Sequence, residues 1–319
     1  MHTLIKDLLL KKLNNPILRE LSDSALIDYR DKIAFTTDSL VVSPLFFPGG
    51  DIGKLAVCAT VNDLVMQAAA PEYLSLALII EEGLDYNILE KIVDSISINA
   101  KNSGVSFVTG DIKVVEKGAC DKIFINTSGM GRIVDNRRLS IKNIEPEDFI
   151  IITGQIAQHG LAVLAKRKEL DLGFNIKSDC AALNDLIIPI LKKTEAIKFM
   201  RDPTRGGMAT TLNEIAENSG LGVMVNEKDI PVSTRVKVGC ELLGIDPLYV
   251  ACEGRAILVV KKDAARNVLN LLRKHPLGRN AQIIGRVISK PKGRVILNTI
   301  LGTERIVDML TSEPLPRIC

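Results

Sequence analysis

The sequence is poor in aromatic residues: none of its 319 residues is tryptophan, and only 4% are aromatic. It therefore has few rings on which exposed bases could stack. It also lacks an excess of one charge, since 41 basic and 38 acidic residues leave a formal net charge of +3. The charges are interspersed, without a basic stripe or a like-charge tail. We expect no nucleic-acid partner.

Long apolar runs are also missing, and no segment has the length and hydrophobicity of a membrane span or a signal peptide. The six cysteines are dispersed and none forms a CxxC pair, which argues against a zinc ribbon or a thioredoxin-like motif. Dispersed thiols are typical of a reduced, cytoplasmic protein. We expect no membrane association, and we expect the five internal cysteines to be buried structural residues.

A hydrophobic content of 46% over this length favours two domains with sizeable cores. Strand and helix signals alternate in the first half of the chain. The helix after Asp85 has that residue as its N-cap and ends at Gly104, and Pro71 is expected to end the helix before it. The predicted elements are strands at 33–37, 73–80, 105–108 and 122–126, helices at 54–70 and 86–103, and a polar linker at 135–148.

The second half opens with an apolar strand and favours an α+β layer, with helices on one face of a sheet. We predict an N-terminal domain at 1–147, a C-terminal domain at 148–310 and a tail at 311–319. The predicted elements are strands at 149–152, 255–261, 281–289 and 294–297, and helices at 158–169, 182–199, 207–219 and 263–274. The fold class is α/β (α+β) with two domains.

The tail ends in a cysteine, and two prolines precede it. Pro314 and Pro316 fix φ and remove two backbone donors, so the segment cannot close a helix or join a central strand. An extended arm of this length reaches on the order of 28 Å. The thiol of Cys319 could then be loaded in one place and unloaded in another. The alternative is an incidental cysteine on a frayed end.

Three aspartates stand where the local pattern does not require them. Asp38 follows the strand 33–37, Asp111 follows the strand 105–108, and Asp63 lies beside Asn62 in an apolar helix. Carboxylates at strand ends are a common ligand position in α/β folds, and Mg²⁺ binds through a few carboxylates plus substrate phosphates. Each aspartate alone could equally be a turn residue or a helix cap.

Glycine-rich segments at helix starts form a second group of candidates. The segment 48–54, which includes Gly49, Gly50 and Lys54, could hold an anion on exposed amides, although it is not a Walker A motif. The segment 201–207 has similar character. His159 lies at another strand-to-helix junction, where a structural role is the alternative. Alone, Glu253 and Lys113 read as surface charges.

Taken together, these segments resemble HypE, a family of hydrogenase maturation factors in the superfamily of aminoimidazole ribonucleotide synthetase and selenophosphate synthetase. The glycine and acidic motifs are shared across the superfamily, whereas the Pro-Arg-Ile-Cys end is specific to HypE. The matching stretches are 37–39 (Thr-Asp-Ser), 44–50, 61–64 (Val-Asn-Asp-Leu), 108–111 (Val-Thr-Gly-Asp) with Lys113, 202–207, 253–254 and 314–319.

The resemblance implies an ATP-dependent enzyme that makes the cyanide ligand of [NiFe]-hydrogenase. A carbamoyl group arrives on Cys319 from the partner HypF, is dehydrated to a thiocyanate, and is passed to iron on the HypC–HypD complex. The family fold implies a homodimer in which N-terminal strands form a shared barrel.

The resemblance also assigns roles. Glu253 is the candidate base, Lys113 polarises oxygen or steadies phosphate, and His159 is a weaker catalytic candidate. It assigns the binding of Mg²⁺ to Asp38, Asp63 and Asp111. It assigns the binding of ATP to Asp38, Gly49, Gly50, Lys54, Asn62, Asp63, Asp111, Asp202 and Arg205.

Three departures from the family pattern remain. The family's N-terminal His-Gly-x-Gly-Gly segment is missing, so we expect a shortened start and leave ATP turnover by this chain open. Ile112 replaces a threonine, and Cys252 replaces an asparagine. Two alternatives follow: a non-catalytic carbamoyl carrier, or another ATP-dependent synthetase of the superfamily. A selenophosphate synthetase needs a cysteine or selenocysteine near its start, and residues 1–57 contain no cysteine.

Overall fold

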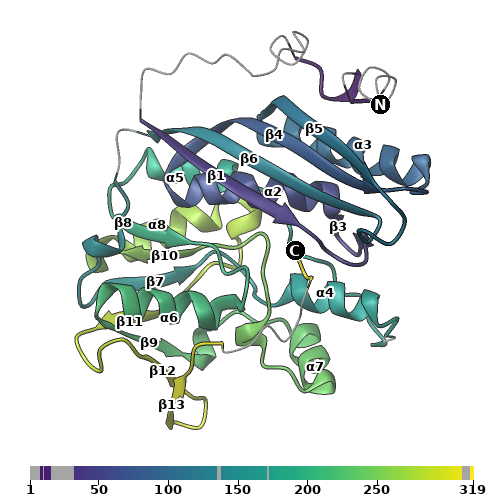
Figure 1. The fold of residues 1–319 in the computed structure, drawn as a ribbon. Helices are drawn as coiled ribbons and strands as arrows, with labels where there is room; N and C mark the ends of the chain where they lie inside the picture. The colour runs from purple at the N-terminus through teal and green to yellow at the C-terminus, as the bar shows by residue number, and fades with distance from the viewer. Residues whose placement is uncertain (1–7, 10, 16–31, 135–137, 171, 311–316) are drawn as a thin grey trace.

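The computed structural model describes residues 8–9, 11–15, 32–134, 138–170, 172–310 and 317–319. Two β-sheets, one from each half of the chain, organise these residues (Figure 1). Across the described ranges, every helix is too short or too polar to cross a membrane.

The N-terminal sheet has the strand order β1–β6–β4–β5 and packs against α2 and α3. β4 and β5 run parallel and are connected through α3, while the other neighbouring strands are antiparallel. A short hairpin, β2–β3, precedes α2. The elements are β1 (Ile33–Leu40), β2 (Phe46–Phe47), β3 (Gly50–Asp51), α2 (Ile52–Met66), β4 (Ala69–Glu81), α3 (Tyr86–Ser103), β5 (Ser106–Val115) and β6 (Ile123–Ile133).

Side chains alternate across this sheet, so that one face is covered and the other is open. The helix-facing residues of β4 and β6 are buried. On the opposite face Phe35 is 68% exposed and Ile79 is 41% exposed. An antiparallel sheet often has one solvated face. Large exposed apolar side chains on such a face are typical of a protein–protein interaction surface.

Helix α2 is the central element of the molecule. Of its residues only Lys54 and Asp63 are not fully buried. It packs on the N-terminal sheet from one side and meets α5 and β8 of the second half from the other. A helix that is apolar all round is expected in such a position, between two layers. This position explains why Asp63 is surrounded by protein.

The predicted end of this helix was wrong. It ends at Met66, and Ala69, Ala70 and Pro71 belong to β4 instead. Pro71 is tolerated because β5 pairs with β4 only from Tyr73 onward, and the ladder with β6 is irregular between Pro71 and Tyr73. The caps of α3 are confirmed: Asp85 accepts from the amide of Asn87, and Gly104 ends the helix with φ of 68°.

Two strands are longer than predicted, which moves two candidate residues. Asp38 lies inside β1, opposite Thr127, rather than after the strand. Asp111 lies inside β5, opposite Ala77 of β4. Their placement at strand ends was therefore wrong, and strand direction and face decide where their side chains point.

The C-terminal sheet has seven strands in the order β13–β12–β9–β11–β7–β10–β8, which are labelled in Figure 1. All neighbours are antiparallel except β9 and β12. The elements are β7 (Phe149–Ile152), α4 (Gln158–Arg167), α5 (Asn184–Leu191), β8 (Ile197–Arg201), α6 (Gly207–Ser219), β9 (Gly222–Asn226), α7 (Thr234–Leu243), β10 (Ile257–Val260), α8 (Ala265–Arg273), β11 (Gln282–Ile288), β12 (Val295–Asn298) and β13 (Glu304–Val307).

Most predicted elements of this half are confirmed, including α6 with its predicted bounds. Two predictions were wrong. Residues 197–201 form the edge strand β8, not the end of a helix. Helices do not cover only one face, because every residue of β10 is buried on whichever side it points. Strands buried on both faces read as continuous apolar runs, which hides the second helical layer from a periodicity argument.

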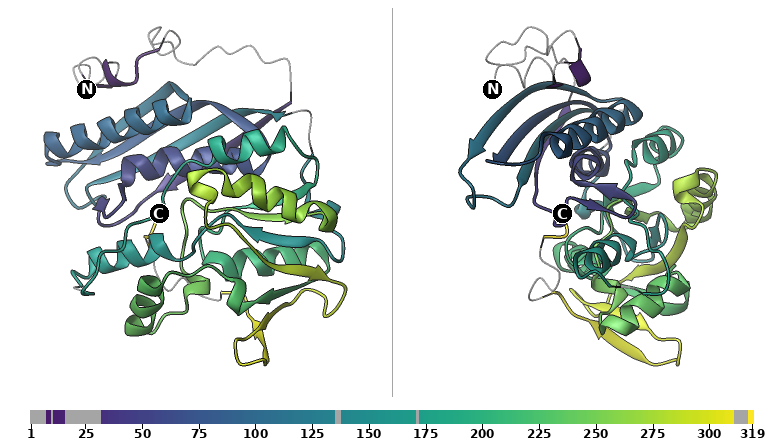
Figure 2. Two further views of the ribbon diagram at one scale, coloured as in Figure 1. Left: turned by 180° about the vertical axis from the view of Figure 1, so that it is seen from behind. Right: turned by 90° about the vertical axis from the view of Figure 1, so that its right-hand side faces the viewer.

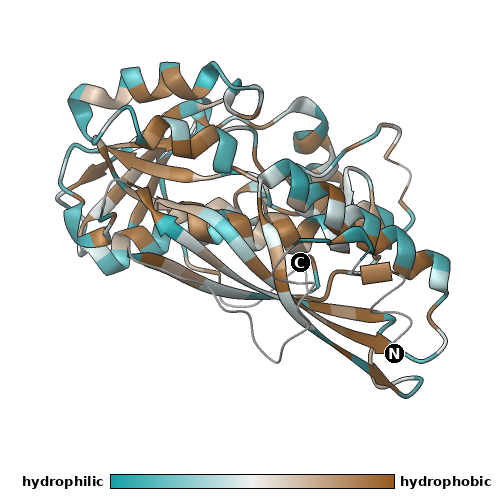
Figure 3. Cartoon of the chain, turned by 90° about the horizontal axis from the view of Figure 1, so that it is seen from above, coloured by the Kyte–Doolittle hydropathy of each residue, from teal (hydrophilic) through white to brown (hydrophobic). Residues whose placement is uncertain are grey.

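The two halves share one continuous set of buried apolar residues. Apolar residues follow the strands of both sheets, while the outer helices carry polar residues on one side (Figure 3). The predicted domain boundary at 147/148 falls between β6 and β7. The docked carboxyl end, Arg317–Cys319, lies between the halves, near the end of β1 and the start of α4 (Figures 1 and 2).

Candidate active site

Four carboxyl groups gather where α2 meets the C-terminal half. We call Asp38, Asp63, Asp202 and Glu253 the acid cluster. Thr60 of α2 donates to Asp38 of β1 at 3.2 Å, and Thr36 of β1 donates to Asp63 of α2 at 2.7 Å. The strand and the helix are therefore linked by two reciprocal hydrogen bonds. These bonds fix both aspartates toward the boundary between the halves.

Asn62 connects this helix to the segments that carry the rest of the site. Its amide nitrogen donates to the carbonyls of Ala181 (3.0 Å) and Glu253 (3.3 Å), and its oxygen accepts from the amide of Leu183 (2.8 Å). The side chain is 1% exposed. We assigned Asn62 to ATP. The structure gives it the role of joining the two halves at the site, because its amide group is already satisfied by protein.

Glu253 is held in a tight loop before β10. It is 2% exposed, and its Oε1 has no hydrogen-bond partner among the described residues. Gly254 must be glycine, because a Cβ there would lie 1.9 Å from the carbonyl oxygen of Asp179. Most buried polar atoms in proteins have partners, so an unsatisfied buried carboxyl group needs an explanation. Catalysis is one such explanation.

Asp202 is presented by the turn that starts α6. Gly206 and Gly207 both have positive φ, at 71° and 60°. A Cβ on Gly207 would lie 2.7 Å from the carbonyl oxygens of Leu248 and Val250. Only glycine fits this turn, which accounts for the glycine pair seen in the sequence. The turn holds Asp202 close enough to Asp63 for their charges to interact.

The carboxyl groups of the cluster raise one another's pKa values. Burial and the charge of Asp63 raise the pKa of Asp38 to about 6, and burial with the same neighbour raises the pKa of Asp202 to about 7. Burial also raises the pKa of Asp63, opposed by Arg201 and Arg205. The pKa of Glu253 lies well above its ordinary range because of burial and the charges of Asp202, Asp179 and Asp38. Arg201 and Arg205 offset the negative charge of the cluster only in part.

The donor set suits Mg²⁺. Among the described residues, no three His, Cys, Asp or Glu side chains are placed so that they could hold one metal ion together. Mg²⁺ does not require one, because it commonly binds one or two carboxylates together with phosphate oxygens. Asp38 and Asp63, linked as described above, would fit that need. Arg205 is exposed, and its charge reaches both aspartates, as a phosphate-binding cation must.

Asp111 is not brought to the acid cluster. It lies on the edge strand β5, separated from β1 by β4 and β6. Its neighbour Ile112 points toward the buried side, so Asp111 and Lys113 lie on the open face. Their charged groups pair at 3.0 Å and are 63% and 70% exposed. Within one chain, Asp111 therefore does not join Asp38 and Asp63, and its role as a metal ligand stays a prediction.

The amides at the start of α2 are not open to an anion. Asp51 caps the helix and accepts from the amides of Gly53 (2.8 Å) and Lys54 (3.0 Å). The Nζ of Lys54 donates to the carbonyl of Gly49 at 3.0 Å. The helix start is thus already occupied by a carboxylate, and anion binding by these amides was a wrong prediction. Gly49, Gly50 and Lys54 remain predicted ATP contacts by motif alone.

The carboxyl end docks beside the site as a short antiparallel ladder. The amide of Val41 donates to the carbonyl of Cys319, and the amide of Ser43 donates to the carbonyl of Arg317, both at 3.2 Å. The guanidinium of Arg167 donates to the carbonyls of Ser43 and Arg317. Ile318 is 5% exposed.

His159 binds the remaining carbonyl of this end. Its Nε2 lies 2.9 Å from the carbonyl oxygen of Ile318, and its Nδ1 lies 2.8 Å from Oγ of Ser178. Since a carbonyl only accepts, Nε2 carries the proton. Ser178 then donates to Nδ1 and accepts from the amide of Cys180 at 3.0 Å. Burial lowers the pKa of His159, in keeping with a neutral ring.

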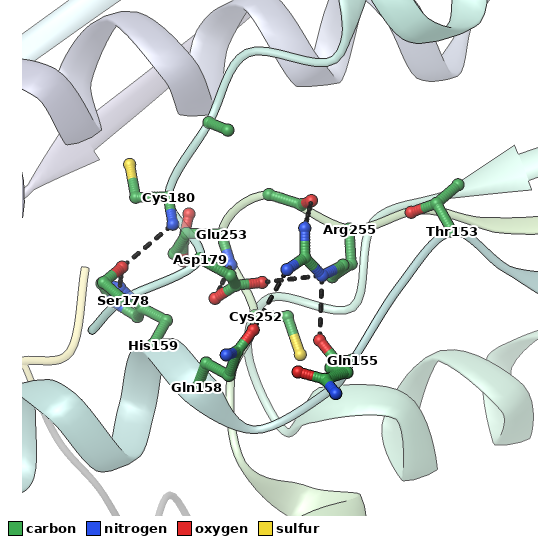
Figure 4. A network of polar contacts seen from close by, with 12 residues as sticks. Thr153, Gln155, Gln158, His159, Ser178, Asp179, Cys180, Cys252, Glu253 and Arg255 are labelled. Atoms are coloured by element: carbon green, nitrogen blue, oxygen red, sulfur yellow. Dashed lines mark hydrogen bonds and ion pairs between the residues drawn. The ribbon is translucent and has the colours of Figure 1, made fainter. Parts of the chain in front are cut away.

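Both nitrogens of His159 are therefore engaged, which favours a positioning role over the catalytic role we considered. We call Val41, Ser43, His159 and Arg167 the docking cradle. Figure 4 shows one residue of each group, His159 of the cradle and Glu253 of the acid cluster, in a single polar network with Ser178 and Asp179. The terminal residues and the candidate base thus meet in the same region.

Sequence reasoning missed several residues of this network. Asp179 is buried beside Arg255, at 3.5 Å, and Arg255 also donates to the carbonyls of Gln155 and Gly254. No local pattern marks Asp179, whereas Arg255 directly follows the Glu-Gly motif. Cys252 accepts from the amide of Ala157 at 3.2 Å, so its thiol performs a structural task. The prediction of buried cysteines holds for all internal ones except Cys120, which is partly exposed.

The two halves match two models of one family. Residues 21–133 match the N-terminal domain of AIR synthase related protein, and residues 145–298 match its C-terminal domain. A carbamoyl dehydratase HypE from Rhodobacter capsulatus is 45% identical, over 94% of this chain and 88% of that protein.

Solved structures give the same result. A crystal structure of hydrogenase maturation protein HypE in complex with ATP has a TM-score of 0.97 at 46% identity, covering 100% of this chain and 96% of that one. A structure of a HypE–HypF complex has a TM-score of 0.85 at 48% identity, covering 96% and 99%.

These two matched halves, with a polar site between them, place the chain in the AIR synthase related class of two-domain proteins. Within that class, the near full-length identity is to HypE proteins. The chain belongs to the HypE family, and the resemblance seen in its motifs is confirmed.

Proposed function

We propose that this chain is the ATP-dependent dehydratase of [NiFe]-hydrogenase maturation and that it carries its own substrate. The substrate is a carbamoyl group held as a thioester-like adduct on the Cys319 thiol, and the product is a thiocyanate that supplies cyanide to the active-site iron. The observation that carries this proposal is the docking of the carboxyl end between the halves. Cys319 accepts from Val41, and the preceding carbonyl binds His159, which lies in one polar network with Glu253 (Figure 4).

The chemistry needs an activated oxygen and a base. Transfer of the γ-phosphoryl group of ATP to the carbamoyl oxygen releases ADP and converts that oxygen into a leaving group. Loss of the N–H protons and cleavage of the C–O bond then release phosphate and leave a C≡N group on sulfur. When bound, Mg²⁺ supplies charge neutralisation at the phosphates, and Asp38 and Asp63 would hold it.

Glu253 is suited to take a proton from nitrogen. Burial raises the pKa of Glu253 well above its ordinary range, so its carboxylate, once ionised, is a stronger base than that of an ordinary glutamate. Its unsatisfied Oε1 is available for this task. The Asp202 and Arg205 turn would contribute to the phosphate side of the site.

The open face of the N-terminal sheet supports a homodimer. Its exposed apolar residues, including Phe35, would be covered by the same face of a second copy. That pairing would form the shared barrel expected from the family and would enclose Asp111 and Lys113. Lys113 could then act on the carbamoyl oxygen or the phosphate from an enclosed position.

HypF would donate the carbamoyl group and HypC–HypD would receive the cyanide, in the cytoplasm. A HypE relative forms a solved complex with HypF, which supports the first of these assignments. Acceptance from one protein and delivery to another require Cys319 to leave the docked position.

The test is stoichiometric release of phosphate. After carbamoylation by HypF and removal of excess reagents, the chain should release one phosphate per carbamoyl group when ATP and Mg²⁺ are added. Cys319→Ala should release only the background amount. Equal release from both proteins would show that ATP hydrolysis is not coupled to the terminal thiol. Absence of release from carbamoylated wild type would favour the carrier.

A further inference from the structure

We infer that the side chain of Arg317 is the anchor that sets the register of the docked carboxyl end, and thereby places Cys319 in the site. This inference deepens the proposed function and rests on it, because it concerns how the substrate-bearing residue is positioned. Arg317 is a positioning residue and takes no part in the chemistry.

The backbone ladder cannot set the register by itself. It joins the amides of Val41 and Ser43 to the carbonyls of Cys319 and Arg317. Such main-chain bonds do not depend on side-chain identity. If the carboxyl end shifted by two residues along β1, it could form two equivalent bonds, and each side chain would still point to the same side of the ladder. Arg167 and His159 likewise contact the docked end at carbonyl oxygens, those of Arg317 and Ile318. A side chain must therefore decide which residue occupies the last position.

Arg317 has the contacts to make that decision. Its Nε donates to the carbonyl of Val41 at 2.8 Å, and its Nη1 donates to the carboxylate of Asp121 at 2.8 Å. Its guanidinium carbon lies 5.8 Å from the centroid of the Phe124 ring. The planar guanidinium of Arg317 therefore contacts three separate places: the end of β1, the loop before β6, and β6 itself.

This arrangement requires arginine. A lysine ammonium could reach one of the two acceptors, but it lacks the planar fork that addresses both in fixed directions. The backbone of Arg317 has φ of 55°, a conformation that is uncommon for residues other than glycine. Such a conformation persists where the surrounding contacts specify it. The contacts of the side chain supply that specification.

The anchor is also suited to reversible docking. The charged groups of Arg317 and Asp121 are 37% and 44% exposed, and exposed ion pairs are weak. By contrast, Ile318 is almost fully buried. The end is thus held by a specific contact that water can replace, together with one apolar residue, rather than by a buried ion pair. This suits a residue that must visit partners.

The test measures alkylation of Cys319 in the full chain by N-ethylmaleimide, followed on the peptide that carries Cys319. Arg317→Ala should be alkylated about tenfold or more faster than wild type, with Asp121→Asn and Arg317→Lys between them. Arg305→Ala is the matched control, because Arg305 forms an exposed ion pair with Asp246 at 3.0 Å on β13. Its rate should equal that of wild type. A wild-type rate for Arg317→Ala would overturn the inference.

A second readout separates the anchor from general damage. HypF should still carbamoylate Arg317→Ala, whereas single-turnover dehydration should slow about as much as alkylation accelerates. Unchanged dehydration in this variant would contradict the anchor. If carbamoylated wild type itself is not dehydrated, the proposed function fails; the alkylation rates then still decide whether Arg317 holds the docked end.

Discussion

The acid cluster and the docking cradle lie side by side, yet they treat buried polar groups in opposite ways. In the cradle every carbonyl of the last three residues has a hydrogen-bond donor. In the cluster, burial and neighbouring carboxyl groups raise the pKa values of Asp202 and Glu253, and Oε1 of Glu253 has no hydrogen-bond partner in the described part of the chain. The cradle is complete as it stands, so it holds. The cluster has more carboxyl groups than nearby cations, and one carboxyl oxygen of Glu253 lacks a donor among the described residues, so it is where substrate, metal and chemistry belong.

The largest difference between the acid cluster and the cradle should appear in the rate of dehydration when the candidate base is removed. Glu253→Gln keeps the size and burial of the side chain but cannot take a proton, so dehydration should fall about 10²- to 10⁴-fold. Carbamoylation by HypF should continue, and the undehydrated adduct should accumulate in a mass spectrum. Glu241→Gln, on the exposed side of α7, is the control. Normal dehydration by Glu253→Gln would exclude it as the base.

The second prediction concerns Mg²⁺, the cation that we expect the acid cluster to bind. Asp63→Asn removes one carboxylate of the predicted Mg²⁺ pair, so half-saturation by Mg²⁺ in the single-turnover reaction should rise at least about tenfold. Asp263→Asn is the matched control, because Asp263 is exposed just before α8. If Asp63→Asn leaves the Mg²⁺ requirement unchanged, the metal lies elsewhere.

The cradle should respond more mildly, because it contributes hydrogen bonds rather than chemistry. His159→Ala removes one donor to the carbonyl of Ile318. A net hydrogen bond corresponds to a factor of about 2 to 12, and dehydration should slow by that amount while alkylation of Cys319 accelerates equally. A loss comparable to that of Glu253→Gln, with unchanged alkylation, would show that His159 takes part in the chemistry.

The smallest effect concerns stability and pH. The native pKa of Asp202 is about 7, against an ordinary value of 3.8. Between these values the folded state binds the proton more tightly, so ionisation of Asp202 destabilises the fold increasingly as pH rises toward about 7. Asp202→Asn should leave Tm unchanged at pH 4 and raise it at pH 8, by about 2–4 °C for each kcal/mol that the ionised Asp202 costs the fold. Equal shifts at both pH values would contradict the electrostatic account.

Local patterns predicted the elements better than the site. The period of α3, its caps and the bounds of α6 could be read from the sequence because each depends on residues a few positions apart. Pro71 misled us, since its place at an unpaired strand end depends on where β5 begins. The position of Asp111 depends on which face of β5 is covered, and one residue of alternation decides that.

The contacts that assemble the site join distant residues. Asn62 binds the carbonyl of Glu253, and His159 binds that of Ile318. Asp51 closes a helix start that looked open to phosphate, because capping competes with ligand binding for the same amides. The motifs identified the acid cluster by resemblance, but the cradle and the Arg317 contacts follow only from the fold.

The most direct test of the account is the intact mass of the chain after incubation with HypF, carbamoyl phosphate, ATP and Mg²⁺, beside Cys319→Ala. We predict that wild type gains one carbamoyl group and then loses one water, while Cys319→Ala gains nothing. An adduct on the alanine variant would contradict the role of Cys319. Carbamoylation that is never followed by loss of water would contradict the claim that the chain dehydrates the group it carries.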